Sequence, residues 1–429
     1  MYETKLLFTP GHNLLNHIKT SSDDKTFEIN LAFLGGCKAG PPGLAHLFEH
    51  CVFLGTTTRT RDEIERGLMK VGGGYNAFTS EDGISFICSG LEGSISKGME
   101  ILTDIAFNCT LDRNIEEEKL VVLAETAPSF NKKKQSIDVG DMGNLLLFGE
   151  EASNILGTEE KVAAYTSDDL LLFKDRNMTK DRCFVSVVSP FDTNIVSDIV
   201  DSFLKDQSDT IFRPEALVVP ANKGIFGVFA QDSDAGSFTV EIQIALNNRP
   251  WTLYSTLQKF VCSALCDGEI SCLFGAARQR GLVYFLGATI QDIVGNSVLN
   301  IGFETTADLN KVEQTVDLIV ESLHRVAEEG VPEEDFELFK NSYLFGLYRA
   351  YQDPHQAASS SIDALFMDVI TPSSQEKIQA IQALDVNTFK ILLTDMLKSE
   401  SKAIAVVGPA PERMMKSKMK CLKEKLKTL

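Results

Sequence analysis

The chain has 429 residues, of which 44% are hydrophobic and 24% are charged, as expected for a folded protein and not for a disordered one. A chain of this length is too long for one ordinary hydrophobic core, which predicts two to four domains or subdomains. The formal net charge of −19 argues against a nucleic-acid partner, which is itself negatively charged.

A strand is predicted over residues 26–34, and a helix follows that contains His46-Leu47-Phe48-Glu49-His50. Residues four apart on a helix project from one face, so His46 and His50 can bind one Zn²⁺ ion. Glu49 lies on the same side and can act on a metal-bound water. The order His-x-x-Glu-His is the inverted form of a common zinc-peptidase motif. The alternative is a buried amphipathic helix with two hydrogen-bonded histidines, but two of only six histidines fall in this turn, which favours the metal site.

Further helices are predicted over residues 62–71, 95–108 and 115–125. Between the first two, the glycines of Gly72–Thr79 followed by alternating residues predict a turn into an exposed strand edge, or an ordinary hairpin. In the third helix, Glu118 and Glu125 are two turns apart and share one face. Either could complete a zinc site, although a solvated acidic face is the alternative, and the residues alone do not select one carboxylate from 60 acidic residues.

Together these segments resemble the pitrilysin-like (inverzincin) zinc peptidases, the family that includes insulin-degrading enzyme and the mitochondrial processing peptidase. The His46–His50 motif, followed by Phe53-Leu54-Gly55-Thr56, is similar to the family's metal site. The segment Glu118–Glu125, which ends 75 residues after His50, is similar to the one that supplies its third ligand. The resemblance implies that the zinc ligands are His46, His50 and Glu125, with Glu49 as catalytic base and Glu118 as a supporting carboxylate.

The glycine-rich segment is similar to the edge strand on which this family binds an extended substrate. By this resemblance, the substrate-binding residues are Gly74, Asn76, Ala77 and Phe78.

The two halves of the chain resemble each other. Glu160–Phe173 aligns with Glu376–Phe389, with five identities in fourteen positions, and each stretch is interpreted as a helix followed by a strand. We infer a duplication. The fold class predicted is α+β, in two similar halves that each contain an antiparallel-rich sheet with helices packed on one face. The boundary is placed in a polar, proline-containing stretch, which gives an N-terminal zinc-bearing domain over 1–212 and a homologous domain over 213–429.

In the second half, strands are predicted over 224–230 and 237–245, and long helices over 309–329 and 333–351. Family members often carry an Arg in this half, followed seven residues later by a Tyr, which together help to hold the substrate. Here Ala277 occupies the expected Arg position. The resemblance implies a role for Tyr284. Either the loop is one residue shorter, with Arg278 or Arg280 as the arginine, or the arginine role is lost. The alternative is a tyrosine packed in the core and an arginine on a solvated face.

The resemblance implies a zinc endopeptidase that cleaves peptides or unfolded segments bound as an added β-strand. A non-catalytic or weakly active partner subunit of a heterodimeric peptidase is the alternative, but the retained zinc-site residues favour catalysis. Because the longer peptidases enclose their cleft with four such halves, this chain is expected to form a homodimer or a heterodimer with a related chain.

The remaining patterns concern the compartment and the C-terminus. The chain has nine cysteines without a Cys-x-x-Cys pair, no signal-peptide pattern and no membrane-length apolar run. These features predict a soluble, cytoplasmic protein with reduced thiols.

Residues 413–427 contain seven basic residues and one acidic residue. This segment is expected to form a helix that docks on the acidic body through Met and Leu side chains, or else a basic tail that contacts a partner.

Overall fold

The structure is a computed structural model that describes residues 2–152, 155–204, 218–246, 248, 252–366 and 372–429. The chain divides into two compact units, each made of three separate stretches. The first unit contains Met1–Ala127, Asn154–Ala216 and Arg349–Val369, and the second contains Pro128–Ser153, Leu217–Tyr348 and Ile370–Leu429. The predicted domain boundary between residues 212 and 213 lies outside the described residues and stays a prediction.

In the described part of the chain, the first unit contains a six-stranded sheet with the order β1-β2-β6-β3-β5-β4. Its strands are β1 (Glu3–Phe8), β2 (Leu14–Lys19), β3 (Thr26–Leu34), β4 (Gly72–Thr79), β5 (Gly83–Leu91) and β6 (Cys183–Ser189). The helices of this unit are α1 (Leu44–Cys51), α2 (Arg61–Val71), α3 (Ile95–Asn108), α4 (Ile115–Thr126), α6 (Glu159–Ala164), α7 (Ser167–Asn177), α8 (Thr193–Leu204) and α13 (Pro354–Phe366).

Over its described residues, the second unit contains a five-stranded sheet with the order β7-β11-β8-β10-β9. Its strands are β7 (Gly224–Gln231), β8 (Ser237–Ala245), β9 (Phe285–Ile293), β10 (Asn296–Thr306) and β11 (Ser401–Gly408). The helices are α5 (Val139–Phe148), α9 (Leu253–Cys266), α10 (Phe274–Gln279), α11 (Leu309–Glu329), α12 (Glu333–Gln352, whose last residues belong to the first unit), α14 (Ser374–Ala383), α15 (Val386–Leu397) and α16 (Glu412–Leu426).

The two sheets have the same connectivity, apart from the additional β1. The order β2-β6-β3-β5-β4 corresponds to β7-β11-β8-β10-β9, with one parallel pair in each, β2 with β6 and β7 with β11. The other pairs in both sheets are antiparallel. The predicted α+β fold of two similar halves is therefore confirmed, and β4 and β9 are the corresponding edge strands.

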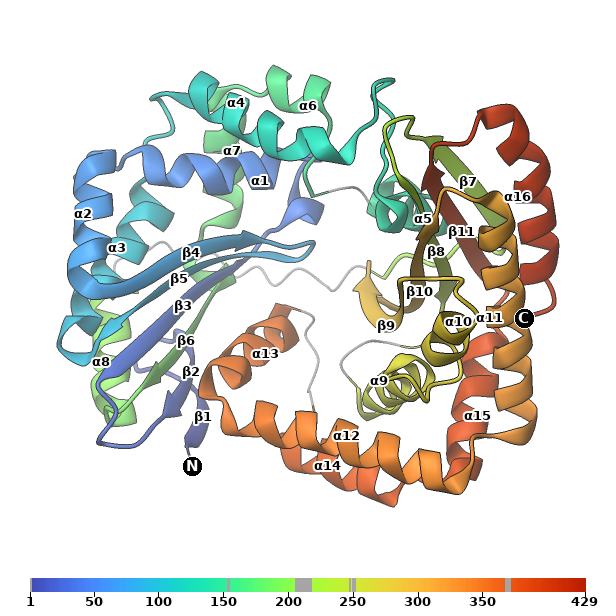
Figure 1. The fold of residues 1–429 in the computed structure, drawn as a ribbon. Coiled ribbons are helices and arrows are strands. Elements are labelled where there is room, and N and C mark those ends of the chain that lie inside the picture. Colours follow the sequence, from blue (N-terminus) through green and yellow to red (C-terminus); the bar gives the residue numbers. More distant parts are fainter. Residues whose placement is uncertain (1, 153–154, 205–217, 247, 249–251, 367–371) are drawn as a thin grey trace. The chain divides into compact units, whose positions relative to one another are not determined.

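Among the described residues, each sheet has a helical layer on one face, and a helix from the other half of the sequence packs on its second face. In β3, alternate residues divide between these faces: Phe33 belongs to the main core, whereas Ala32 and Leu34 cluster with Ile362 of α13. In the second sheet, Ala405 of β11 clusters with residues of α5. Figure 1 shows α13 and α5 beside their sheets. The sequence patterns did not predict this exchange.

Each of the two repeated stretches forms two helices, so the prediction of one helix in each was wrong. In the first, Thr166 ends the α6–α7 connection and caps α7, because its side chain accepts from the main-chain amide of Asp169. In the second, Asp385 caps α15 in the same way, accepting from Thr388. The aligned residues Asp169 and Asp385 thus occupy different positions, since the offset between the copies changes at the helix junction.

The basic C-terminal segment forms α16, which packs on α11 and β7. Its buried side chains are Met415, Met419, Leu422 and Leu426. The docked-helix interpretation is confirmed. Among the described residues, no helix is long and apolar enough to cross a membrane.

Docking of α16 is expected to depend on pH through Glu313 of α11. Hydrogen bonds from Lys418 and Cys421, together with the charge of Lys425, lower the pKa of Glu313 from 4.5 to about 2. A depressed carboxyl pKa contributes stability that is complete above the unfolded value and is lost as pH falls towards the folded value. We expect Glu313→Gln to lower the free energy of unfolding by about 1 kcal/mol at pH 7 and by almost nothing near pH 2, measured by urea denaturation. The exposed Glu321 of the same helix supplies the control, Glu321→Gln; an equal loss at both pH values would refute this role.

Candidate metal centre

The two histidines of the motif lie on α1, which begins after Gly43. Gly43 has a φ of 85°, where glycine is favoured, and a Cβ there would lie 2.8 Å from the main-chain oxygen of Leu156. One side of α1 packs into the core of the first unit. The remaining side carries His46, Glu49 and His50, so the helix presents the three residues that the motif predicted to act together.

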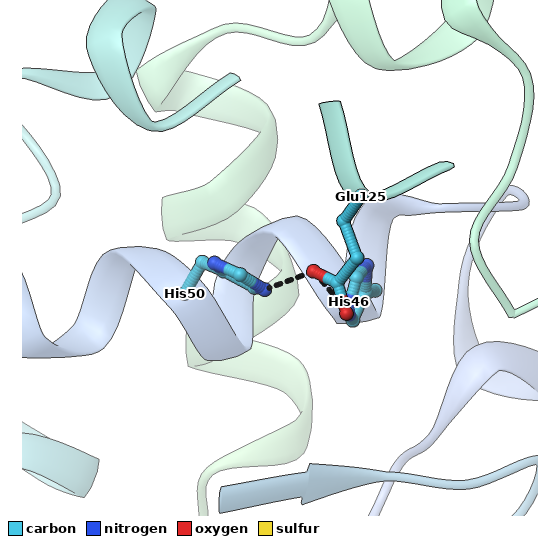
Figure 2. A group of neighbouring side chains, drawn as sticks. All are labelled: His46, His50 and Glu125. Atoms are coloured by element: carbon cyan, nitrogen blue, oxygen red, sulfur yellow. Dashed lines mark ion pairs between the residues drawn. The ribbon is translucent and has the colours of Figure 1, made fainter. Parts of the chain in front are cut away.

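The side chains of His46, His50 and Glu125 converge, as Figure 2 shows. Their candidate ligand atoms all lie within 4.8 Å of one another. The Oε2 atom of Glu125 is 3.3 Å from Nε2 of His50 and 3.9 Å from Nε2 of His46. Two imidazoles and one carboxylate form the ligand set of many catalytic zinc sites, in which the fourth position is left for water or substrate. The residues present therefore fit Zn²⁺.

Helix α4 supplies both carboxylates of this cluster. Glu125 approaches Nε2 of His50, whereas Glu118, two turns earlier, accepts a hydrogen bond of 3.2 Å from Nδ1 of the same ring. A carboxylate behind a metal-binding histidine holds the ring and its tautomer in place. Glu118 is buried and also pairs with Arg61 at 3.7 Å. The two glutamates were predicted to share one helix face, and their carboxylates lie on either side of the His50 imidazole.

Two pKa shifts follow from burial at this site. Burial, followed by the charge of His50, lowers the pKa of His46, which favours the neutral imidazole that a metal ion requires. Burial raises the pKa of Glu49, an effect opposed by hydrogen bonds from Thr79. The Thr79 hydroxyl donates to Oε2 of Glu49 at 2.6 Å.

The predicted substrate-binding segment is β4, at the edge of the first sheet and hydrogen-bonded there to β5. Gly74, Asn76 and Phe78 are exposed and Ala77 is half-buried. Gly73 lies so close to β5 that a Cβ would be 2.0 Å from the Ser89 oxygen, which explains a glycine here. A pocket of about 240 Å³ adjoins this strand. Its lining includes Glu49, His50, Phe53, Tyr75, Asn76 and Glu118.

The second-half candidates lie in the second unit. Ala277 is fully buried, so the position where the family carries arginine points into the core here. Arg278 is exposed on α10, and its Nη1 donates to the main-chain oxygen of Tyr284 at 3.3 Å. The Tyr284 side chain is 80% exposed, which excludes the core-packed alternative for it. Arg280 is also exposed, and the roles of these three residues stay predictions.

Sequence reasoning missed two residues that contact the cluster. Arg61 reaches Glu118, and Thr79 reaches Glu49. Thr79 is the last residue of the glycine-rich segment Gly72–Thr79 that carried the resemblance, so its place in that segment was the available signal. Nothing in the local sequence distinguishes Arg61 from the chain's other basic residues.

Comparison with known proteins gives two family matches. Residues 38–138 match the insulinase model (peptidase family M16), and residues 164–343 match the model of the M16 inactive domain. The chain therefore belongs to peptidase family M16, and the pitrilysin-like resemblance is confirmed.

Similar proteins agree with this assignment. An uncharacterized zinc protease of Mycobacterium leprae is 26% identical over 378 residues, which cover 86% of this chain and 82% of that protein. The beta subunit of the mitochondrial-processing peptidase of Blastocladiella emersonii is 34% identical over 146 residues, or 33% of this chain and 31% of that one. A protease from Helicobacter pylori has the same fold, with a TM-score of 0.84 at 14% identity, covering 95% of this chain and 100% of that chain.

Proposed function

We propose that the protein is a zinc-dependent endopeptidase that cleaves peptides or unfolded protein segments. The observation that carries this proposal is the convergence of His46, His50 and Glu125, with Glu49 beside them on α1. A two-histidine, one-carboxylate set fits a hydrolytic zinc site, and the family relatives include proteins described as zinc proteases.

Zn²⁺ held by His46, His50 and Glu125 would polarise the scissile carbonyl and acidify a bound water. The chain's own residues transfer the proton and hold the ligands in place. Glu49 accepts the proton of the attacking water and returns it to the leaving amine. Glu118 holds His50 through Nδ1, which keeps Nε2 free for the metal ion.

The substrate is an extended segment that pairs with the free edge of β4. An unpaired edge binds a peptide through its main chain, so folded segments without an accessible strand are excluded. Gly74, Asn76, Ala77 and Phe78 line this edge and would contact the substrate. The direct test is to incubate the purified chain with an unstructured peptide and follow its cleavage; cleavage should stop when a chelator is added and resume when zinc is restored.

The second candidate function is a partner subunit with little or no activity of its own. The buried Ala277 favours it, because the arginine of the second half is missing from its usual position. The zinc content of the purified chain separates the two candidates, since a purely structural subunit has no need of a stoichiometric metal ion.

The active form is proposed to be a homodimer or a heterodimer with a related chain. One relative is named as a beta subunit, which supports association with a related chain. If a second chain completes the cleft, activity per mole of protein should fall on dilution as the assembly dissociates. Light scattering at each concentration measures the assembly state alongside activity. A monomer that retains full activity at high dilution would show that no partner is needed.

A further inference from the structure

The hydroxyl group of Thr79 connects the edge strand β4 to the carboxylate of Glu49 on α1. This hydroxyl donates to Oε2 of Glu49, with 2.6 Å between the two oxygens, the length expected of a hydroxyl bound to a charged carboxylate. The two residues are 30 positions apart in the sequence and both are half-buried. The contact therefore joins two elements of the first unit that the proposed reaction uses together.

The β4–β5 turn has its own hydrogen bonds and does not depend on this hydroxyl. Ser80 Oγ donates to the Gly83 oxygen at 3.1 Å and accepts from the Gly83 amide at 3.0 Å. Thr79 pairs with Ile84 through the main-chain ladder. A change confined to the Thr79 side chain should thus leave the hairpin in place.

A glutamate carboxylate ends a side chain with three rotatable bonds, and a general base works only within hydrogen-bond reach of the proton that it removes. When one carboxylate oxygen is held, the direction of the other is set as well. Two groups of Thr79 hold the carboxylate of Glu49: the main-chain amide, which every variant keeps, and the hydroxyl at 2.6 Å, which a side-chain substitution can remove.

We propose that Thr79 is a positioning residue for hydrolysis, which fixes the Glu49 carboxylate and ties it to the strand that binds the substrate. This inference rests on the proposed function. Because Thr79 lies on the same strand as Asn76 and Phe78, it places the base in register with a peptide paired to that edge.

Three variants test the proposal in the full-length, zinc-loaded protein. Thr79→Val removes the hydroxyl and keeps the branched shape, whereas Thr79→Ser keeps the hydroxyl and removes the methyl group. Thr26→Val is the matched control, because Thr26 Oγ1 also donates to a carboxylate, that of Asp24 at 2.7 Å, at the start of β3 in the same sheet. The measurements are kcat and KM on an unstructured peptide, zinc content, and the melting temperature.

Thr79→Val should lower kcat about tenfold, the loss expected when one hydrogen bond to a charged group is removed, with KM and zinc content unchanged. Thr79→Ser should recover most of that loss, and Thr26→Val should behave as the unmodified chain. Crystal structures give a readout independent of activity: the Glu49 carboxylate should turn in Thr79→Val and keep its orientation in Thr79→Ser.

An unchanged kcat in Thr79→Val, or a Thr79→Ser variant as slow as Thr79→Val, would overturn the proposal. So would a Glu49 carboxylate that keeps its orientation without the hydroxyl. An unmodified chain that binds no zinc and cleaves no peptide is a different result, because it refutes the proposed function itself.

Discussion

Replacing Glu49 by Gln is expected to abolish peptide hydrolysis while zinc stays bound. The amide keeps the size of the side chain but cannot accept a proton, and none of the three proposed ligands is altered. General-base catalysis typically contributes about 10²–10⁴-fold, so kcat should fall by at least two orders of magnitude. Steady-state kinetics on an unstructured peptide measure the loss of kcat, and metal analysis of the same sample measures the bound zinc.

The control for the lost negative charge is Glu117→Gln, because Glu117 is exposed on α4, next to Glu118 in the sequence. It should match the unmodified chain in rate and zinc content. Hydrolysis by Glu49→Gln at the unmodified rate would remove Glu49 from the mechanism. Loss of zinc from this variant would instead show that the carboxylate acts as a ligand.

Replacing a proposed ligand should release the metal, and activity should be lost as a consequence. His50→Ala and Glu125→Gln each leave two ligands of three, which is too few for a stable catalytic zinc site. Glu118→Gln should weaken zinc binding by about 10–100-fold without abolishing it, because Glu118 acts on the metal only through the ring of His50. Competition with a zinc-binding dye measures the affinity of each variant.

Glu117→Gln serves as the control here as well, since it removes a neighbouring carboxylate from the same helix. If Glu125→Gln kept full zinc occupancy while Glu118→Gln lost the metal, the roles of the two carboxylates would be reversed. The geometry argues against that outcome, because Glu125 approaches the Nε2 atoms of both histidines.

Local spacing was enough to predict that His46, Glu49 and His50 act together, because four residues make about one helical turn. It was not enough for Glu125, which comes from another helix. Only the resemblance selected it, and the structure then placed it against both histidines. A contact between two helices depends on the tertiary fold, which no spacing within one helix can reveal.

The fold, too, was partly predictable from local sequence and partly not. Five identities in fourteen aligned positions of the repeated stretches indicated a duplication. The matching connectivity of the two sheets confirms that the halves are similar. The exchange of α5 and α13 between the halves was not predictable, because neither helix carries a local signal for the sheet that it covers. The helix junctions at Thr166 and Asp385 were missed although capping residues were present, since a gapless alignment concealed them.

Burial explains why Ala277 occupies the position where an arginine was expected from the resemblance. A side chain at this position points into the core of the second unit, so an arginine could not be accommodated there with the present register. Arg278, the next residue, is exposed and contacts Tyr284, which keeps an arginine beside the tyrosine although the spacing has changed.

We propose that His46, His50 and Glu125 hold a zinc ion on which hydrolysis depends. Zinc titration of the metal-free chain, with bound metal and peptide cleavage measured in the same samples, tests it most directly. Activity should be absent without metal, rise in proportion to bound zinc and level off at about one ion per chain. Full cleavage by the metal-free chain, or a chain that binds no zinc, would contradict it.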